Sequence, residues 1–283
     1  MKLSLGLTPR DYLVAGGAAF VGLLDSYPNA SAAYSLRKLR SAYAGNCIRV
    51  RRSSDNTEQN IGFVNNALDT TTLLTFCGVG NGFVTTWYDQ SSNGNNATQT
   101  TAANQPQIVS NGNVITITGI GQANPTLLFD GVNDSFSFTN VNITTFTSFY
   151  PQAKPLTGRS AWFTQNVGTG GPYTPIMFGD GNIYIGNSSK TTWGTYSNSN
   201  TQFLLLSGYV DSSNNGFIKS NNSGLSLPGT FVDGGQTYFN SINNRGNLYY
   251  SYCYTPEMIL YNFNNSANES AINDNINNYF KIY

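Results

Sequence analysis

From about residue 105 to the C-terminus, the chain alternates short apolar segments with clusters of turn-forming residues. Segments such as VITITGI, TLLFDG, SFSFTNV, QFLLLSGYV and NLYYSYCY are separated by GNG, DGVND, DGN and NNSG. Glycine, asparagine and aspartate supply the positive φ angles and the side-chain hydrogen bonds that tight turns need. Short strands at roughly ten-residue spacing are typical of a β-sandwich. We therefore predict an all-β, jelly-roll sandwich.

Three segments favour short helices within this β fold. Residues 29–43 (NASAAYSLRKLRSAY) place apolar side chains at three- and four-residue spacing, with basic side chains on the other side. Residues 68–76 begin with a pair of helix-capping side chains. Residues 266–280 begin with Ser266 and Glu269, which are spaced as in a capping box.

The N-terminal segment is more apolar than the rest. Residues 13–24 (LVAGGAAFVGLL) are followed by the small residues 30–32 (ASA), an arrangement that mimics a secretory signal. Charged residues and a proline precede the run, and the run is too short to cross a bilayer. We therefore expect no membrane span and no cleaved signal peptide. We predict an N-terminal arm at 1–28, for attachment or packing, and a single jelly-roll domain at 29–283.

The charge balance limits the partners of this chain. Charged residues make up only 10% of it, against about 25% in a typical globular domain. Lys plus Arg and Asp plus Glu are 14 each, and asparagine alone outnumbers all charged residues. Because there is no basic block, we expect no nucleic-acid partner. A neutral surface rich in Asn, Ser, Thr and Gly suits a protein that works inside an assembly or contacts neutral sugars.

The chain contains no histidine, which removes the usual general base and the commonest transition-metal ligand. Its three cysteines, Cys47, Cys77 and Cys253, are too few for a disulfide framework and lack zinc-site spacing. We expect three buried thiols. We expect no metal site and no cofactor. Calcium, held by clustered turn oxygens, is the alternative, although no DxDxDG spacing is present.

The stretch TTWYDQSSNGNNATQ (85–99) poses the main functional question, which is the role of Asp89. It could be a catalytic carboxylate, a ligand or a turn residue. Its context favours a strand that ends in an Asx-type turn, with Asp89 accepting hydrogen bonds from the backbone of residues 91–93. The Asp-Gly dipeptide at 180–181 is interpreted as a turn as well. The predicted structural turn residues are Asp89, Asn93, Gly94, Asp130, Gly131 and Asp134.

Candidate glycan-binding residues are aromatic side chains that offer an apolar face beside Asn and Asp hydrogen-bonding groups. Trp193 lies in a polar, loop-like stretch, where burial in a core explains a large aromatic side chain less well. Trp87 lies in a strand and is also interpreted as a core residue. The candidate set is Trp87, Tyr88, Trp162, Tyr184, Trp193 and Tyr196.

Several segments resemble known families. TLLFDGVNDSFSF and EMILYNFNNSANESAINDNINNYF resemble laminin-G-type, concanavalin A-like jelly-roll domains. AAYSLRKLRSAYAGNCIRVRRSSDNTEQNIGF, TTWYDQSSNGNNATQ and NIYIGNSSKTTWG (182–194) resemble the catalytic domain of family 54 α-L-arabinofuranosidases. The same front half is similar to structural and tail proteins of bacteriophages. The resemblance runs from about residue 25 to the end and implies a concanavalin A-like sandwich.

The resemblance also implies a catalytic pair that this chain lacks at the expected places. A nucleophilic Glu is expected after residues 182–194, but TYSNSNTQFLLL contains no carboxylate. An acid Asp is expected before the closing helix, where Asn264, Asn265 and Asn268 stand instead. An amide cannot donate and recover a proton as a carboxylic acid does. The adjacent cysteine pair of the family is missing too. We therefore predict no catalytic residues and no enzymatic activity.

The predicted function is that of a non-enzymatic bacteriophage virion protein with a glycan-binding surface, as a tail fibre, capsid decoration or adhesion subunit. Its expected partners are other virion proteins, contacted through the N-terminal arm, further copies of itself and a cell-surface glycan. Such a protein would be assembled in the host cytoplasm and located in the virion. Two alternatives remain, an arabinofuranosidase-like glycoside hydrolase and a secreted carbohydrate-binding protein.

Overall fold

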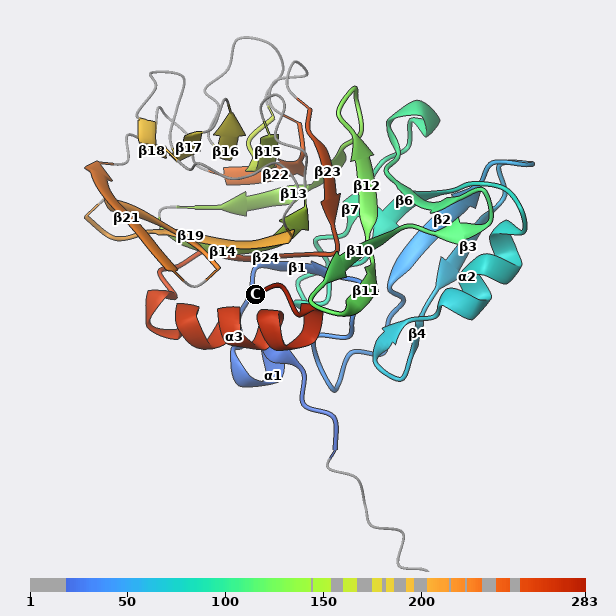
Figure 1. Cartoon of the computed structure of the whole chain (residues 1–283), viewed down its shortest axis with the longest axis horizontal. Coiled ribbons are helices and arrows are strands. Elements are labelled where there is room, and N and C mark those ends of the chain that lie inside the picture. The colour runs from blue at the N-terminus through green and yellow to red at the C-terminus, as the bar shows by residue number, and fades with distance from the viewer. Residues whose placement is uncertain are drawn as a thin grey trace, which may run out of the picture.

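The computed structural model describes residues 19–143, 145–153, 160–166, 175–179, 182–185, 192–195, 203–213, 215–221, 223–230, 238–244 and 250–283. Within these residues the chain is mostly antiparallel strand, with a few short helices. The main strands form one connected, curled sheet, and two parts of it face each other as a sandwich (Figure 1). The prediction of an all-β, jelly-roll-like sandwich is confirmed.

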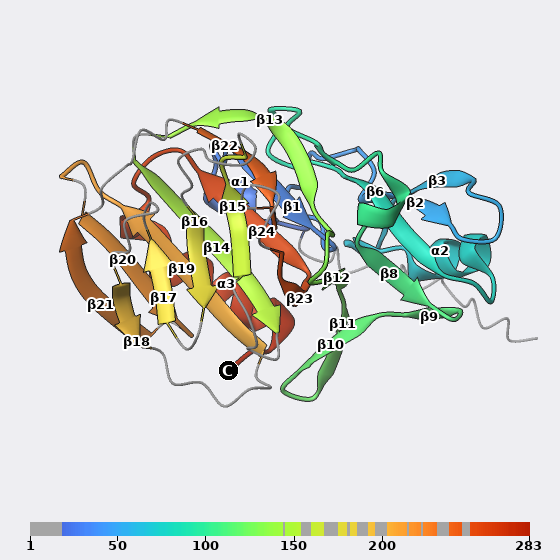
Figure 2. The same ribbon diagram turned by 90° about the horizontal axis from the view of Figure 1, so that it is seen from above.

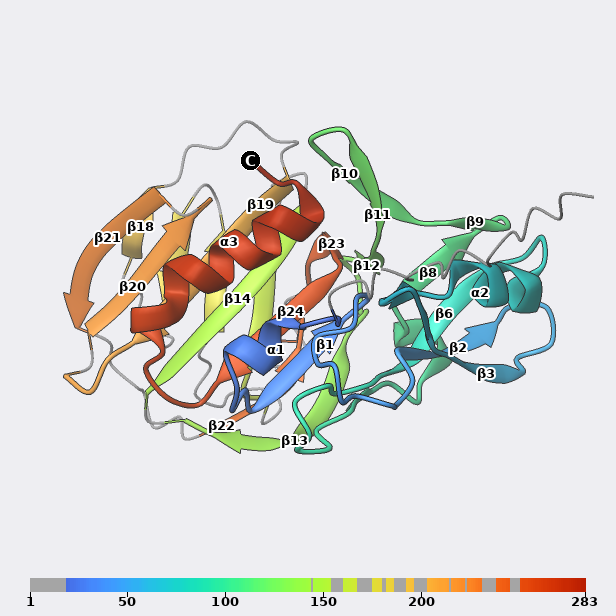
Figure 3. The same cartoon turned by 90° about the horizontal axis from the view of Figure 1, so that it is seen from below.

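One part of the sandwich carries helices on its outer face and is called the helix-covered sheet (Figures 1 and 3). The helices are α1 (Leu23–Ser26) and α3 (Glu269–Phe280), the latter preceded by the 3-10 turn η2 (Ser266–Asn268). In order of pairing, the strands are β21 (Ser223–Thr230), β20 (Asn215–Ser220), β19 (Phe203–Val210), β14 (Phe146–Ala153), β24 (Glu257–Tyr261) and β1 (Ala32–Ser35).

The opposite sheet lies across the core from the helix-covered sheet, and Figure 2 shows it from above. Its strands, in order of pairing, are β18 (Thr192–Thr195), β17 (Asn182–Ile185), β16 (Pro175–Gly179), β15 (Ser160–Thr164), β22 (Tyr238–Ile242) and β13 (Phe136–Asn142). Every pairing in this series is antiparallel, as expected for a sandwich built from hairpins.

A side lobe extends the sandwich beyond β13 (Figure 2). Its strands are β7 (Ala97–Thr98), β6 (Gly82–Trp87), β2 (Ile48–Arg52), β3 (Glu58–Ile61), β8 (Gln107–Ser110), β9 (Asn113–Val114), β12 (Leu127–Asp130) and β23 (Tyr252–Thr255). The lobe also carries α2 (Thr70–Cys77), η1 (Ala102–Asn104) and the short pairs β4 (Phe63–Val64) with β5 (Ala67–Leu68) and β10 (Thr116–Gly119) with β11 (Gln122–Pro125).

Two clusters of buried apolar side chains stabilise these layers. The larger cluster fills the space between the sheets and includes Trp87, Phe136 and Phe163. The smaller one lies under α3 and joins Ile272 and Ile276 of that helix to the helix-covered sheet. Strand residues enter the large cluster because side chains alternate between the two faces of a strand.

Residues 29–43 do not form the predicted helix, and this prediction was wrong. Residues 32–35 form β1, which pairs with β24 in the helix-covered sheet. The backbone that follows is satisfied by Gln90, whose amide accepts from Leu39 N at 2.7 Å and donates to the Ser35 and Arg37 carbonyls, each at 3.0 Å. These distant partners replace the i to i−4 bonds of a helix, so tertiary pairing outweighs the apolar periodicity.

The other two predicted helices are present. In the first, α2, the Asp69 side chain accepts from Thr72 N at 3.0 Å as an N-cap. In the second, η2 and α3 together cover residues 266–280. The predicted capping box is absent, however. Glu269 is buried and accepts from Ser207 Oγ at 2.7 Å, because a buried carboxylate needs partners that compensate for its lost hydration.

The described part of the predicted N-terminal arm contacts the domain itself. Leu23 and Leu24 of α1 are buried in the cluster under α3. The first half of the apolar run at 13–24 lies outside the described residues, as do residues 1–12. Within the described part of the chain, no helix is long and apolar enough to cross a membrane.

Candidate functional site

Asp89 lies just after β6 and organises the loop that follows. Its Oδ1 accepts from Ala33 N and Ser91 N, both at 2.9 Å. Its Oδ2 accepts from Ser91 Oγ at 2.7 Å and from Asn95 N at 3.0 Å. The side chain is buried, and each carboxylate oxygen accepts two hydrogen bonds. Asp89 therefore joins the loop to β1, and its carboxylate is not available for chemistry.

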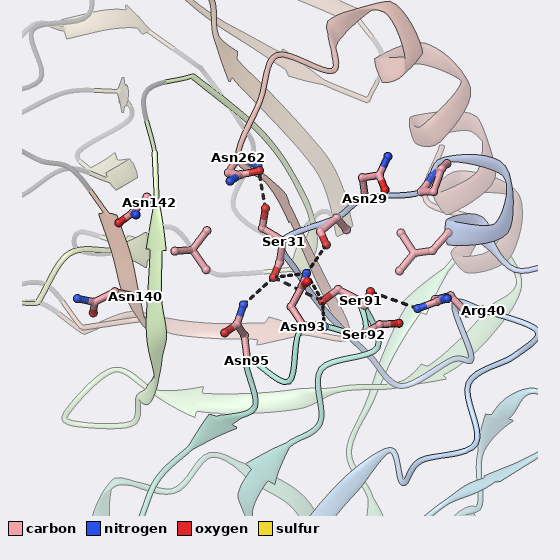
Figure 4. A pocket seen from close by; sticks show the side chains of 14 residues that line it. Asn29, Ser31, Arg40, Ser91, Ser92, Asn93, Asn95, Asn140, Asn142 and Asn262 are labelled. Carbon is pink, nitrogen blue, oxygen red and sulfur yellow. Dashed lines mark hydrogen bonds between the residues drawn. The ribbon is translucent and has the colours of Figure 1, made fainter.

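The loop held by Asp89 forms one wall of a large polar groove of about 690 Å³ (Figure 4). We call this the asparagine groove. The asparagines that line it are Asn29, Asn93, Asn95, Asn140, Asn142 and Asn262. The Asn93 amide donates to the Ala30 and Ser31 carbonyls at 2.9 and 3.2 Å, which fixes the floor of the groove. No carboxylate is among the described residues that line this groove, so they include no carboxyl group for acid–base chemistry.

Most other carboxylates in the described part of the chain are committed to structural partners. Glu257 is fully buried and accepts two hydrogen bonds from the Arg37 guanidinium, at 2.7 and 3.0 Å, and one from Ser35. Lys219 lies 2.8 Å from the Glu269 carboxylate. The remaining pairs or caps involve Asp25 with Gly22 and Ser41, Asp55 with Arg52, Glu58 with Arg49, and Asp69 with Thr72.

Asp130 and Asp134 differ from these carboxylates because both of them line the same pocket. Asp130 and Asp134 lie at the end of β12, in a pocket of about 280 Å³ that we call the carboxylate pocket. The Oδ1 of Asp130 accepts from the backbone N–H groups of Val132, Asn133 and Asp134 at 2.8 to 3.4 Å. The Oδ2 of Asp134 accepts from Asp130 N at 2.8 Å. Among described residues, the other oxygen of each carboxylate has no hydrogen-bond partner.

Burial raises the pKa of Asp134 to about 7, and the negative charge of Asp130 beside it acts in the same direction. The single N–H donated by Asp130 opposes this shift without cancelling it. A carboxylic acid that keeps its proton near neutral pH, next to a second carboxylate, has the properties of a general acid.

An aromatic pair on β23 lies beside the carboxylate pocket, with Tyr252 exposed and Tyr254 half-buried. In the pairing of β12 with β23, Asp130 is opposite Tyr252 and Leu128 is opposite Tyr254. Because residues opposite one another project from the same face, both tyrosines lie beside the pocket-lining Asp130 and Leu128. The two rings are edge to face with centroids 5.9 Å apart. Such rings can stack against the apolar face of a sugar.

Of the six aromatic residues predicted from the sequence, only Trp87 and Tyr88 have side chains within the described structure. Trp87 is fully buried in the main core, so its ring cannot contact a glycan. Tyr88 donates its hydroxyl to Asn60 at 2.8 Å on the surface of the side lobe. The side chains of Trp162, Tyr184 and Trp193, and all of Tyr196, lie outside the described residues, as does the Asp180-Gly181 turn.

The cysteines are all free and buried, as predicted. Burial raises the pKa values of the Cys47 and Cys77 thiols, which opposes the reactive thiolate form. Within the described residues, no group of three or more His, Cys, Asp or Glu side chains could hold a metal ion.

Comparison with known proteins gives one matching family. Its model describes the catalytic domain of α-L-arabinofuranosidase B and matches residues 25–124. A family 54 α-L-arabinofuranosidase soaked with a cyclic sulfate inhibitor has a TM-score of 0.60 and 16% identity, covering 87% of this chain and 62% of that chain. An arabinofuranosidase in complex with arabinofuranosyl-α-1,2-xylobiose has the same TM-score and coverage, with 17% identity. No curated protein matches.

The resemblance to the family 54 catalytic domain is therefore supported at the level of the fold. The chain spans less than two thirds of the length of the solved arabinofuranosidase chains that it matches.

These matches contradict the prediction of a non-enzymatic virion protein. The matched family is a catalytic domain, the matched structures are arabinofuranosidases, and nothing in them indicates a bacteriophage protein. The non-enzymatic part of this prediction relied on the absence of carboxylates from two short segments. Catalytic groups sit on loops that vary among proteins with the same scaffold, so that absence does not exclude a pair elsewhere in the chain.

The main features of the asparagine groove and of the carboxylate pocket were not predicted from the sequence. The sequence pattern indicates a turn residue at Asp134, with calcium at the clustered turn oxygens as the alternative, because burial and the nearby Asp130 raise the pKa of Asp134 only in the folded chain. Tyr252 and Tyr254 were not candidates, although their alternation with Cys253 in YYSYCY places them on one face of a strand. The asparagines of the groove come from segments that are far apart in the sequence.

Proposed function

We propose that the chain is an arabinofuranosidase-like glycoside hydrolase that acts on neutral glycans carrying α-L-arabinofuranosyl groups. The match of residues 25–124 to an arabinofuranosidase catalytic domain is the observation that supports this most directly. Those residues supply β6, β8 and η1, which carry one side of the carboxylate pocket. The neutral composition of the chain agrees with an uncharged substrate.

Glycoside hydrolysis needs a carboxylic acid that protonates the leaving oxygen and a second carboxylate that attacks the sugar or activates water. Asp134 is the candidate acid, because its proton is retained to about pH 7. Asp130 is the candidate second carboxylate. In the reaction, the Asp134 proton goes to the glycosidic oxygen as its bond to the anomeric carbon breaks. Water then adds its hydroxyl to that carbon, and its remaining proton restores the acid.

The surroundings of the pair fit a small uncharged sugar. Gln107 and Phe83 line the same pocket, and the Phe83 ring is covered by the Arg51 guanidinium at 4.9 Å. Tyr252 offers a ring beside Asp130 on the outer face of β23. A pocket of about 280 Å³ lies at the small end of the usual range for ligand sites, which suits one sugar ring.

The test is turnover of 4-nitrophenyl α-L-arabinofuranoside and release of arabinose from arabinan. We expect the wild type to cleave both, with an activity that falls as the pH rises through about 7, because Asp134 then loses its proton. Asp134→Asn should lower kcat by a factor of about 10²–10⁴, the range for loss of a general acid. Asp55→Asn is the matched control and should keep full activity, since Asp55 forms an exposed pair with Arg52.

Two results would overturn the proposal at different levels. No turnover of any arabinofuranoside by the wild type would reject the activity. Turnover that survives Asp130→Asn and Asp134→Asn, but is lost in Asp180→Asn, would keep the activity and reject the assignment of the acid.

A further inference from the structure

The asparagine groove combines a large volume with an almost uncharged lining. Arg40 is the charged residue among those that line it, and its guanidinium donates to the Ser91 carbonyl at 3.2 Å. A ligand with a formal negative charge would find no further cation there, and a cationic ligand would find no carboxylate. The groove is therefore suited to a neutral, hydrogen-bonding molecule.

Free amides lie at the rim of the groove. The side chains of Asn29 and Asn262 are exposed and form no hydrogen bond within the described residues. Figure 4 places Asn262 and Asn29 above the floor formed by Ser31 and Asn93. Each free amide offers two donors and one acceptor, the combination that hydroxyl groups of a sugar can satisfy in both directions.

Apolar side chains complete the walls of the groove. Leu24 of α1 and Val141 of β13 both line it, and both are buried against the protein on their other sides. Asn140 and Asn142 point away from Asn93 and Asn95 in Figure 4, as the alternation of a strand requires if Val141 faces inward. The lining thus combines many polar groups with a few apolar side chains.

The backbone and the floor of the groove are held in position before any ligand binds. Asn29 has a φ of 68° and Ser92 a φ of 85°, both in the left-handed region. The segment of Ser92 is fixed by Asp89, and the Asn95 amide donates to the Ser31 carbonyl at 2.8 Å. A preformed arrangement reduces the entropy lost on binding.

From these observations, we propose that the asparagine groove binds neutral oligosaccharide chains as a second site, apart from the carboxylate pocket. The two cavities share no lining residue, and the groove lacks a carboxylate. This binding does not depend on the proposed hydrolysis. Its role is to hold an uncharged glycan chain against the protein surface.

The test is isothermal titration calorimetry of the full chain with arabinan oligosaccharides and with oligosaccharides of a neutral glucan. Asn29→Gly removes one amide while keeping a residue that tolerates the positive φ, and Asn262→Ala removes the other. The matched control combines Asn65→Gly, also at a positive φ of 49°, with Asn113→Ala. All four positions are exposed, so folding should be unaffected.

We expect the double variant Asn29→Gly with Asn262→Ala to bind at least about tenfold more weakly, since two hydrogen-bonding groups are lost. The control double variant and Asp134→Asn should bind as the wild type does. The groove variant should cleave the aryl arabinofuranoside at the wild-type rate, so failure of binding and failure of catalysis can be told apart. Equal binding by the groove variant and the wild type would overturn the proposal, as would binding of only anionic glycans.

Discussion

Asp89 and Asp134 both follow a strand of the side lobe, and both are buried, yet their surroundings give them opposite properties. Asp89 accepts four hydrogen bonds, three of them from backbone N–H groups of residues 33, 91 and 95. Asp134 accepts one, from Asp130 N, and has the charge of Asp130 beside it. The donors around Asp89 thus make it a link between segments of the fold, whereas burial and the charge of Asp130 raise the pKa of Asp134.

The largest expected effect is on the Asp89 side of this comparison. Asp89→Ala should lower the free energy of unfolding by about 3–5 kcal/mol, since four hydrogen bonds are lost and the buried Ala33 N–H is left without a partner. Denaturant unfolding measures this loss. Asp55→Ala, at an exposed ion pair, should cause a much smaller change. Equal losses in the two variants would contradict the structural role of Asp89.

The next effect concerns Asp134 and has a defined pH dependence. The pKa of Asp134 in the folded chain is about 7, above the ordinary value of 3.8. Between pH 3.8 and pH 7, Asp134 therefore keeps a proton in the folded chain that it has already released in the unfolded chain. This contribution to stability is complete below about pH 4 and is lost as the pH rises through 7.

Asp134→Asn stays neutral at every pH and should not show that loss. Between pH 4 and 8, the difference in unfolding free energy between wild type and Asp134→Asn should change by about 2–4 kcal/mol, at about 1.4 kcal/mol per unit of pKa shift. Denaturant unfolding at a series of pH values measures it. A constant difference over this range would mean that Asp134 is ionised in the folded protein.

The smallest effect tests whether Asp89 acts alone in holding its loop. Asn93 donates to the Ala30 and Ser31 carbonyls but is itself exposed. Asn93→Ala should therefore lower the free energy of unfolding by only about 1 kcal/mol, the net value of an ordinary hydrogen bond. Thermal unfolding can resolve this against Asn113→Ala as the control. A loss as large as that of Asp89→Ala would show that the amide, rather than the carboxylate, is the main link.

The local sequence pattern was sufficient to predict those structural elements whose hydrogen-bond and packing partners are near in the sequence. Asp69 caps α2 through Thr72, three residues away, and the α3 segment buries one face at helical spacing. Asp89 also accepts from Ser91 N, two residues away, as an Asx-type turn predicts. Such contacts follow from residue type and spacing, because chain connectivity alone brings the partners together.

Long-range pairing decided what local pattern could not. Residues 32–35 form a strand because they pair with β24, which lies more than 200 positions later in the sequence. Gln90 then forms hydrogen bonds with the backbone that follows this strand. Glu269 does not form the predicted capping box, because its carboxylate contacts Ser207 and Lys219 instead. The sequence by itself therefore determined the β-sandwich class, the turns and two helices. Only the tertiary structure decided which carboxylates are surrounded by hydrogen-bond donors, that burial raises the pKa of Asp134, and which asparagine side chains line the groove, because these properties depend on burial and on neighbours from distant segments.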